Sequence, residues 1–243
     1  MSAPARAHQA LVSTSPLGAL EGAHVKSLLV YDTETTGLVR YGLPLTAECQ
    51  PHVLQFAYMV LDYDGSAAPT IRLRGSMYLR LPDGAEIPEE ATRVHGITHK
   101  IVGDEGVEPT LLLDLLDVLS TEVHVTCGHN AGYDRSVLDV LAERNNRPTA
   151  RWMDSRGILD TMHLTRNILR IPQAKPWNRE FKSPKLTEAH SRLCGFDIED
   201  AHRADADVLA CVNVLHAVLT RGDTAANSIL ESPAGLAYPF YRR

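Results

Sequence analysis

The sequence predicts an α/β fold, and three patterns support that prediction. Leu28–Tyr31 is a short apolar run with β-branched and aromatic residues, which is typical of a buried strand. Residues 109–119 carry leucines at helical spacing and indicate an amphipathic helix. From residue 123 onward, a short strand (123–127) is followed by a helix (131–143). Such alternation of strands and helices is typical of α/β domains.

Two further strands and a short helix are predicted before residue 100. Residues 51–64 and 70–81 have the composition of strands, and the turn at Asp64-Gly65 between them favours antiparallel pairing. Residues 88–94 begin with Pro88, a residue that suits the first helical position, followed by two glutamates. This segment therefore predicts a short helix.

The composition is that of one globular domain. The chain has 243 residues, 44% hydrophobic and 22% charged, without a run of eighteen apolar residues, so we expect no membrane-spanning helix and no membrane partner. The four cysteines are scattered without a Cys-x-x-Cys pair, which argues against a zinc site or a disulfide framework. They fit a reducing compartment, and we expect a cytoplasmic location.

The two ends of the chain differ from its middle. Residues 1–25 are rich in Ala, Ser and Pro and predict a mobile tail. They lack the pattern of a signal peptide, while the single acid Glu21 leaves a transit peptide open. We expect the folded domain over residues 26–222 and a C-terminal tail over 223–243.

Asp32 and Glu34 follow the first strand two residues apart. Side chains alternate along a strand, so both carboxylates point to one face, and Gly37 then allows the backbone to turn. Two carboxylates on one face repel each other unless a cation lies between them, and hard oxygen ligands suit Mg²⁺ or Mn²⁺. Asp-x-Glu is so common that, taken alone, a solvated pair in a turn is the default interpretation.

A second polar block, His129–Asp134, lies where a strand ends and a helix begins. Open α/β sheets place their sites at strand ends. Asp134 falls in the first turn of the helix, where the helix dipole alone would favour an acid, and Asn130 fits an ordinary helix cap. The block is therefore a candidate site whose residues also have plain structural explanations.

The third block, Ala201–Asp207, leads into the last predicted helix. Asp207 faces inward if the apolar positions that follow it at helical spacing form the buried stripe. His202 precedes it by five residues, in the turn entering the helix. A histidine has an ordinary pKa near 6.5 and can act as a general base near neutral pH, although most of the eleven histidines must be surface residues.

Taken in order, the three blocks resemble the DEDDh class of 3′–5′ exonucleases, the superfamily of the epsilon proofreading subunit, the TREX enzymes, ribonuclease T and oligoribonuclease. The matching residues are Asp32, Glu34, Asp134, His202 and Asp207, and VHGIT at 94–98 also looks like the family's sequence. The resemblance covers about residues 26–220. It implies a ribonuclease H-like fold: a mixed five-stranded sheet flanked by helices on both faces.

The resemblance also implies a mechanism. Two divalent cations, Mg²⁺ or Mn²⁺, about 3.5–4 Å apart would cleave the phosphodiester with water. Asp32, Glu34 and Asp207 would hold the first ion, Asp32 would bridge to the second, and Asp134 would support that one. His202 would take the proton from the attacking water. The products would be nucleoside 5′-monophosphates released from a 3′ end.

Six further positions match family residues that lie near the substrate. The resemblance places three after Glu34 close to the terminal nucleotide, one against a base, and two beside the scissile phosphate. In that order they are Thr35, Thr36, Leu38, Ile97, Asn130 and Tyr133. Leu38 is a candidate wedge against the last base, and for Leu38 and Ile97 ordinary core packing is the alternative.

Residues 166–185 depart from a minimal family member. They hold six basic residues and one acid, with Trp177 and Phe181 among them, and their prolines predict a loop. Basic residues interleaved with aromatics can bind single-stranded nucleic acid by phosphate contact and stacking. A solvated connection with Trp177 in the core explains the segment equally well.

The expected partner is a nucleic acid with a free 3′ end, with single-stranded DNA favoured. The net charge of −6 is unusual for a protein that relies on affinity for duplex DNA. DTETTG and VHGIT resemble the proofreader and TREX branch, whereas the oligoribonuclease branch usually carries Met in place of Thr35. An exoribonuclease or oligoribonucleotide-trimming enzyme is the first alternative, and a non-catalytic nucleic-acid-binding domain the second. A homodimer, or a polymerase or repair partner, is left open.

Overall fold

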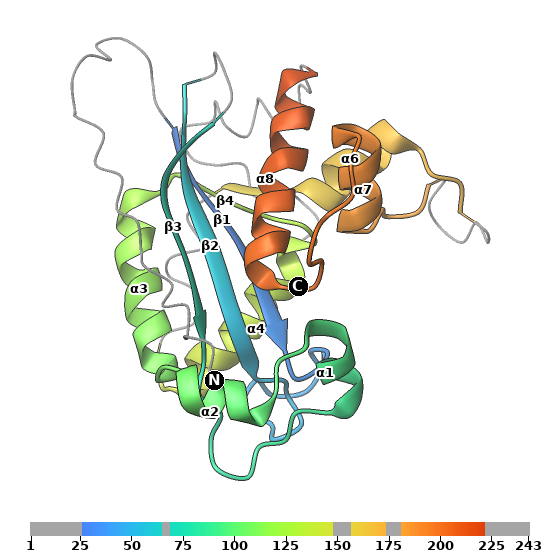
Figure 1. Ribbon diagram of the computed structural model, residues 1–243. Coiled ribbons are helices and arrows are strands. Elements are labelled where there is room, and N and C mark those ends of the chain that lie inside the picture. Colours follow the sequence, from blue (N-terminus) through green and yellow to red (C-terminus); the bar gives the residue numbers. More distant parts are fainter. Residues whose placement is uncertain (1–25, 65–68, 148–156, 174–180, 222–243) are drawn as a thin grey trace, which may run out of the picture.

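Figure 1 shows the computed structural model of the protein, which describes residues 26–64, 69–147, 157–173 and 181–221. Its strands are β1 (Lys26–Thr35), β2 (Val53–Tyr63), β3 (Thr70–Tyr78), β4 (Val125–Gly128) and β5 (Gly157–Asp160). Its helices are α1 (Glu89–His95), α2 (His99–Glu105), α3 (Pro109–Glu122), α4 (Ala131–Arg144), α6 (Thr161–Leu169), α7 (Leu186–Cys194) and α8 (Ala204–Thr220). Both predicted tails lie outside the described residues.

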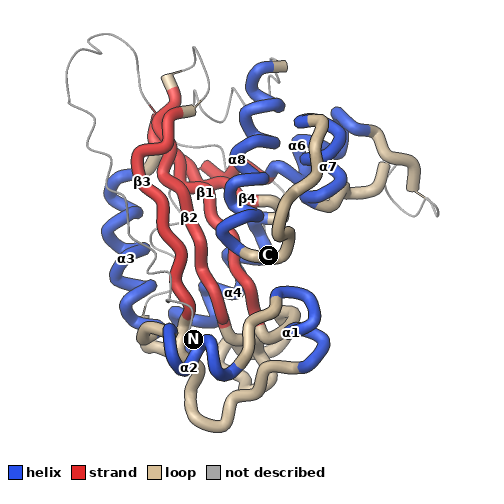
Figure 2. Tube along the Cα trace, in the orientation of Figure 1, coloured by secondary structure: helices blue, strands red, loops and turns tan. Residues whose placement is uncertain are grey.

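The five strands form one mixed sheet in the order β3-β2-β1-β4-β5 (Figure 2). β1 pairs antiparallel with β2 and parallel with β4, β2 pairs antiparallel with β3, and β4 pairs parallel with β5. The predicted α/β class and the antiparallel pairing of the second and third strands are confirmed. β1 therefore lies at the centre of the sheet, where both its faces are covered.

Alternation along β1 divides the core into two layers. Leu28 and Val30 pack with α6, α7 and α8 on one face, whereas Leu29 and Tyr31 pack with α3 and α4 on the other. Since side chains alternate along a strand, the residues that continue the first series, at positions 32 and 34, point toward α8. The register with β2 shifts immediately after Glu34, and such bulges re-aim side chains at the end of a strand.

Several elements differ from their predicted form. β5 has only four residues, all buried, and is too short to show a period in the sequence. The predicted loop at 166–185 is wrong over 166–169, which form the last turn of α6, because the first proline, Pro172, lies beyond the end of that helix. Pro172 and Phe181 form an isolated antiparallel bridge. Lys175, Trp177 and Arg179 lie outside the described residues.

Within the described ranges, no helix is long and apolar enough to cross a membrane.

Candidate active site

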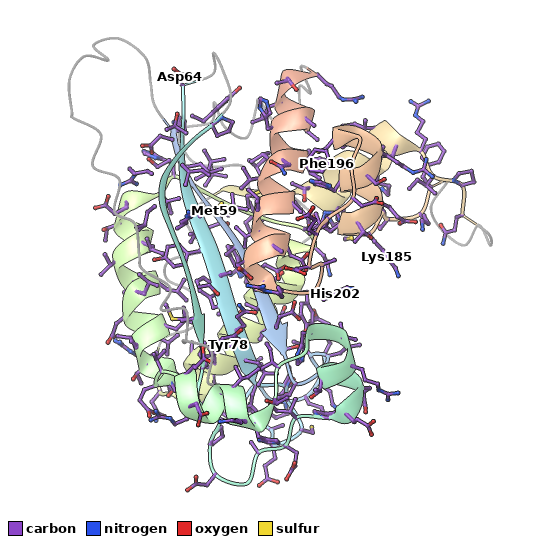
Figure 3. The ribbon with its side chains drawn as sticks, viewed as in Figure 1. Met59, Asp64, Tyr78, Lys185, Phe196 and His202 are labelled. Atoms are coloured by element: carbon purple, nitrogen blue, oxygen red, sulfur yellow. The ribbon has the colours of Figure 1, made fainter. Side chains whose placement is uncertain are left out.

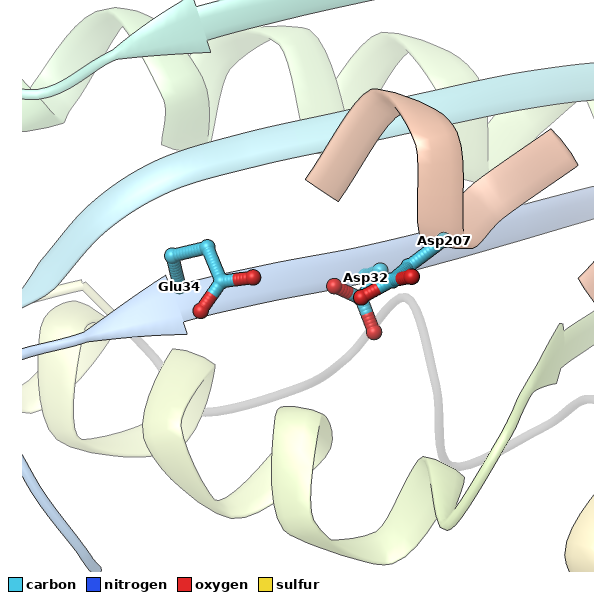
Figure 4. Close-up of side chains that lie close together, drawn as sticks. All are labelled: Asp32, Glu34 and Asp207. Carbon is cyan, nitrogen blue, oxygen red and sulfur yellow. The ribbon is translucent and has the colours of Figure 1, made fainter. Parts of the chain in front are cut away.

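Three carboxylates from two distant parts of the chain meet beside the centre of the sheet (Figure 4). Asp32 and Glu34 come from β1, and Asp207 comes from the first turn of α8, which packs on β1. One oxygen from each of the three lies within 4.8 Å of the others. The four apolar residues expected beside Asp207 (Val208, Cys211, Leu215 and Val218) are all buried. A group of three oxygens at this spacing could hold a divalent cation.

Burial raises the pKa of each of these carboxyl groups, and repulsion from neighbouring carboxylates adds to the effect. For Asp32, burial raises the pKa well above its ordinary value, with further contributions from Asp134, Asp207 and Glu34. For Glu34, burial and the charges of Asp207 and Asp134 raise the pKa to about 8. Burial also raises the pKa of Asp207, against a lowering effect of His202. The cluster thus favours protons or a cation over free negative charge.

These shifts make the metal-free protein sensitive to alkaline pH. A carboxyl with a raised pKa in the folded state binds more protons there than in the unfolded chain, so stability falls as pH rises from about 4 toward 8. Buried histidines act oppositely at lower pH: burial and Arg144 lower the pKa of His52 to about 4. We therefore expect the melting temperature in EDTA to fall between about pH 6.5 and 9.

Calorimetric scans across that range test this expectation, with Glu34→Gln as the comparison. The substitution removes one titrating group and should flatten the decline, and a divalent cation should reverse it in the wild type. A melting temperature in EDTA that rises with pH across this window would contradict the assignment of raised carboxyl pKa values.

Asp134 lies outside this three-carboxylate group but close to it. The residue is 3% exposed in the first turn of α4, as predicted, and its Oδ1 accepts hydrogen bonds from the backbone N–H (2.9 Å) and hydroxyl (2.7 Å) of Thr33. Burial raises its pKa to about 7, although the Thr33 bonds lower it. Its charge contributes to the raised pKa of Asp32 and Glu34, so it acts on the same site from the α4 side of β1.

His202 lies in the turn that precedes α8 (Figure 3). Its backbone N–H donates to Asp207 Oδ2 at 3.2 Å, and its side chain is exposed. The backbone φ is 70°, a left-handed conformation that non-glycine residues rarely adopt and that concentrates at functional sites. The neighbouring Asp205 pairs with Arg203 at 2.9 Å.

The polar side chains that follow Glu34 bind one another. The Thr35 hydroxyl contacts the Tyr133 hydroxyl at 2.8 Å, and both lie within 2.9 Å of the Gly37 carbonyl oxygen. The Thr36 hydroxyl accepts a hydrogen bond from the His52 backbone N–H at 2.9 Å. These contacts fix the turn after β1. Immediately beyond it, the side chain of Leu38 is 79% exposed, so Leu38 does not pack in the core.

Ile97 does not reach the surface. It is 2% exposed and packs with Leu54, Ile87 and Val102, which agrees with the alternative of ordinary core packing. Asn130 is exposed and adopts a left-handed conformation at the start of α4, without a side-chain cap. The expected capping role of its side chain is therefore wrong.

Two polar residues that hold the starts of the helices around the site were not identified from the sequence. Asp160, fully buried at the end of β5, accepts from the backbone N–H groups of Asn130 (3.1 Å) and Met162 (2.9 Å). Gln55, 3% exposed on β2, lies with its Oε1 3.3 Å from the Ala204 backbone N–H and so ties the start of α8 to the sheet. A polar residue inside the apolar run VLQFAYMV was the available signal for Gln55.

Comparisons with known proteins bear on this geometry. The model of the exonuclease family RNase_T matches residues 29–215. A Mycobacterium tuberculosis (strain CDC 1551 / Oshkosh) protein named as a bifunctional exonuclease/endonuclease is 32% identical over 135 residues, which make up 56% of this chain and 19% of that protein. The crystal structure of E. coli exonuclease I in complex with a dT13 oligonucleotide aligns with a TM-score of 0.66 and 20% identity, over 84% of this chain and 43% of that chain.

The zinc-bound form of that enzyme with single-stranded DNA aligns with a TM-score of 0.66 and 21% identity, over 84% of this chain and 42% of that chain. The chain therefore spans less than half the length of these relatives. The structural likeness confirms the ribonuclease H-like mixed sheet that the sequence resemblance implied.

Proposed function

The chain belongs to the RNase_T family of exonucleases, and on that premise we propose that it is a metal-dependent 3′–5′ exonuclease that releases nucleoside 5′-monophosphates from single-stranded DNA. The observation that carries the proposal is the meeting of Asp32, Glu34 and Asp207 within 4.8 Å of one another at the centre of the sheet. Such a group of acids is the usual protein contribution to metal-assisted phosphodiester hydrolysis.

The donor set fits divalent cations with oxygen ligands, Mg²⁺ or Mn²⁺. Three half-buried carboxyls whose pKa values are all raised favour a bound cation over free negative charge. Two such ions, when bound, supply an activated water and neutralise the leaving oxygen. Asp32, Glu34 and Asp207 would hold the first ion, and Asp32 would also support the second. Asp134, whose Oδ1 accepts two hydrogen bonds from Thr33, would support the second ion.

His202 acts as the general base in this proposal. Its backbone is tied to Asp207 while its imidazole is exposed, so the ring can reach a water at the carboxylate cluster without being a ligand itself. Leu38 is the wedge against the last base, since it is exposed directly after the turn that begins at Glu34. Asn130 lies beside the scissile phosphate, and Thr35, Thr36 and Tyr133 hold the turn that presents Leu38.

Single-stranded DNA is the proposed substrate because the sequence features around Thr35 favour it and the net charge of −6 disfavours reliance on a duplex. The E. coli enzyme in the comparison binds a dT13 oligonucleotide, which agrees with this choice. We place the folded unit at residues 26–222.

Product analysis on end-labelled oligonucleotides tests the function directly. DNA and RNA, single- and double-stranded, labelled at either end, should be compared with Mg²⁺, Mn²⁺ and EDTA. The expected result is stepwise shortening of 5′-labelled single-stranded DNA, immediate release of a labelled mononucleotide from the 3′-labelled strand, and no reaction in EDTA. Faster cleavage of RNA would assign the exoribonuclease alternative, and binding without any product would make the chain a non-catalytic nucleic-acid-binding domain.

A further inference from the structure

The connection between β1 and β2 presents exposed apolar side chains next to the candidate active site. Tyr41 is 72% exposed and Leu43 48% exposed, and they follow the exposed Leu38 along the same connection. Val39 between them points inward and is 8% exposed, so the connection is anchored in the core rather than lying loosely on the surface. Exposed apolar side chains that follow one another closely along a connection beside an active site are a candidate binding surface, here called the apolar row.

Buried polar contacts hold this connection in one conformation. Gln50 is 3% exposed, and its amide accepts from the Arg40 backbone N–H (3.0 Å) and donates to the Arg40 carbonyl oxygen (3.1 Å). From α4, the Arg144 guanidinium donates to carbonyl oxygens of the same connection, including those of Ala47 (2.8 Å) and Gln50 (2.9 Å). Tyr41 is therefore displayed on a fixed backbone, which removes the entropic cost of ordering a loop on binding.

Tyr41 lies near the first turns of α4, the helix that carries Asp134. The Tyr41 hydroxyl lies 3.5 Å from Ser136 Oγ, two residues beyond Asp134 on α4. Leu38 and Tyr41 are three residues apart, so their Cα atoms are at most about 11 Å apart. Stacked nucleotides advance about 3.4 Å each, which places Tyr41 at the second to fourth nucleotide if Leu38 contacts the last.

Arg40 adds a positive charge at the same place. Its side chain is exposed and forms no ion pair with another residue of the described part of the chain. On a protein with a net charge of −6, an exposed arginine next in sequence to an exposed tyrosine is complementary to a single strand, which offers both phosphates and unstacked bases.

We propose that Arg40 and Tyr41 form a second nucleotide subsite, in which a base upstream of the 3′ terminus stacks on Tyr41 and its phosphate contacts Arg40. The inference rests on the proposed function and names its substrate class more closely: a strand whose last few bases are unpaired, because a base in a duplex cannot offer its face to a side chain. Leu43 extends the apolar row beyond Tyr41.

The dependence of kcat/KM on oligonucleotide length measures this subsite. Oligothymidylates from two to six nucleotides should be degraded with increasing efficiency by the wild type, because longer strands reach Tyr41. In Tyr41→Ala the rise of kcat/KM with length should be about ten-fold smaller, which is the scale expected for one stacked base. Tyr41→Phe should keep it, since stacking needs the ring and not the hydroxyl that faces Ser136.

Phe196→Ala is the matched control. Phe196 is also an exposed aromatic, at 58%, but it lies beside α7 and away from the end of β1 (Figure 3), so its loss should leave the length dependence intact. Equal losses for Tyr41→Ala at every length, or an equal loss for Tyr41→Phe, would show that the residue only holds the loop and would overturn the subsite. So would a wild-type dimer that Tyr41→Ala dissociates, since the row would then be an interface between copies.

A binding measurement separates failure of the subsite from failure of the proposed function. In the Asp207→Asn background, 2-aminopurine placed upstream of the 3′ end should lose fluorescence on binding by stacking, and Tyr41→Ala should restore it. Tyr41-dependent quenching in a protein whose wild type cleaves nothing would refute the exonuclease function alone. Cleavage by the wild type with quenching that is unaffected by Tyr41→Ala would refute the subsite alone.

Discussion

Asp207→Asn should eliminate nucleotide release, lowering kcat by about 10³-fold or more. The substitution removes one of three carboxylates that lie within 4.8 Å of one another, and a metal contributes several kcal/mol to the transition state. The side chain keeps its size, and its carbonyl oxygen can still accept the His202 backbone N–H, so the fold should persist. Initial rates on 5′-labelled DNA measure the loss of kcat, and Mn²⁺ titration by calorimetry measures the loss of metal affinity.

The stability of the same variant gives an independent check. Because burial and repulsion raise the pKa of these carboxyls, a neutral amide should leave the metal-free protein at least as stable as the wild type at about pH 8. Asp205→Asn is the matched control, since Asp205 lies on the same helical turn but pairs with Arg203. Near-wild-type turnover by Asp207→Asn, or an equal loss in Asp205→Asn, would refute the role of the cluster.

His202→Asn should lower kcat by about 10²–10⁴-fold with metal affinity and DNA affinity near those of the wild type. Asparagine is chosen because the backbone φ of 70° is left-handed, which asparagine tolerates and alanine does not. The backbone N–H that donates to Asp207 is also retained. The loss of kcat therefore measures the contribution of the imidazole ring alone.

The pH dependence at saturating metal distinguishes a base from a ligand. A general base must be unprotonated, so the wild-type kcat should rise with pH. This rise should be absent in His202→Asn. His202→Gly provides a second variant that accepts the same backbone conformation. Recovery of kcat at high Mn²⁺ concentration, with weakened binding by calorimetry, would identify His202 as a metal ligand instead.

The sequence predicted the central part of the site because period and spacing are local. Alternation along one strand was enough to place Asp32 and Glu34 on one face, and the helical stripe after Asp207 was enough to turn that residue inward. The family resemblance of the three blocks then implied that these faces meet. The direction of a side chain on a strand or helix could therefore be predicted from local periodicity, without knowing which other element it contacts.

Contacts between distant residues could not be predicted in this way. Thr35 and Tyr133 were proposed to touch substrate, yet they bond to each other across 98 positions, and nothing local signals that partnership. Asp160 comes from a four-residue strand whose pattern is too short to recognise. Leu38 and Ile97 are both apolar and both adjoin a glycine, but one is 79% exposed and the other 2%, because only the surrounding packing decides their direction.

The separation of the acidic residues along the chain has a consequence for synthesis. Asp32 and Glu34 leave the ribosome early, whereas Asp207 belongs to the last described helix, and the three meet only when α8 packs on β1. Chains grow and fold from the N-terminus, so a nascent chain that ends before α8 carries two of the three carboxylates and no complete cation site. We therefore expect the proposed site to be completed in one late step, and incomplete chains to be inactive toward the nucleic acids that surround them during translation.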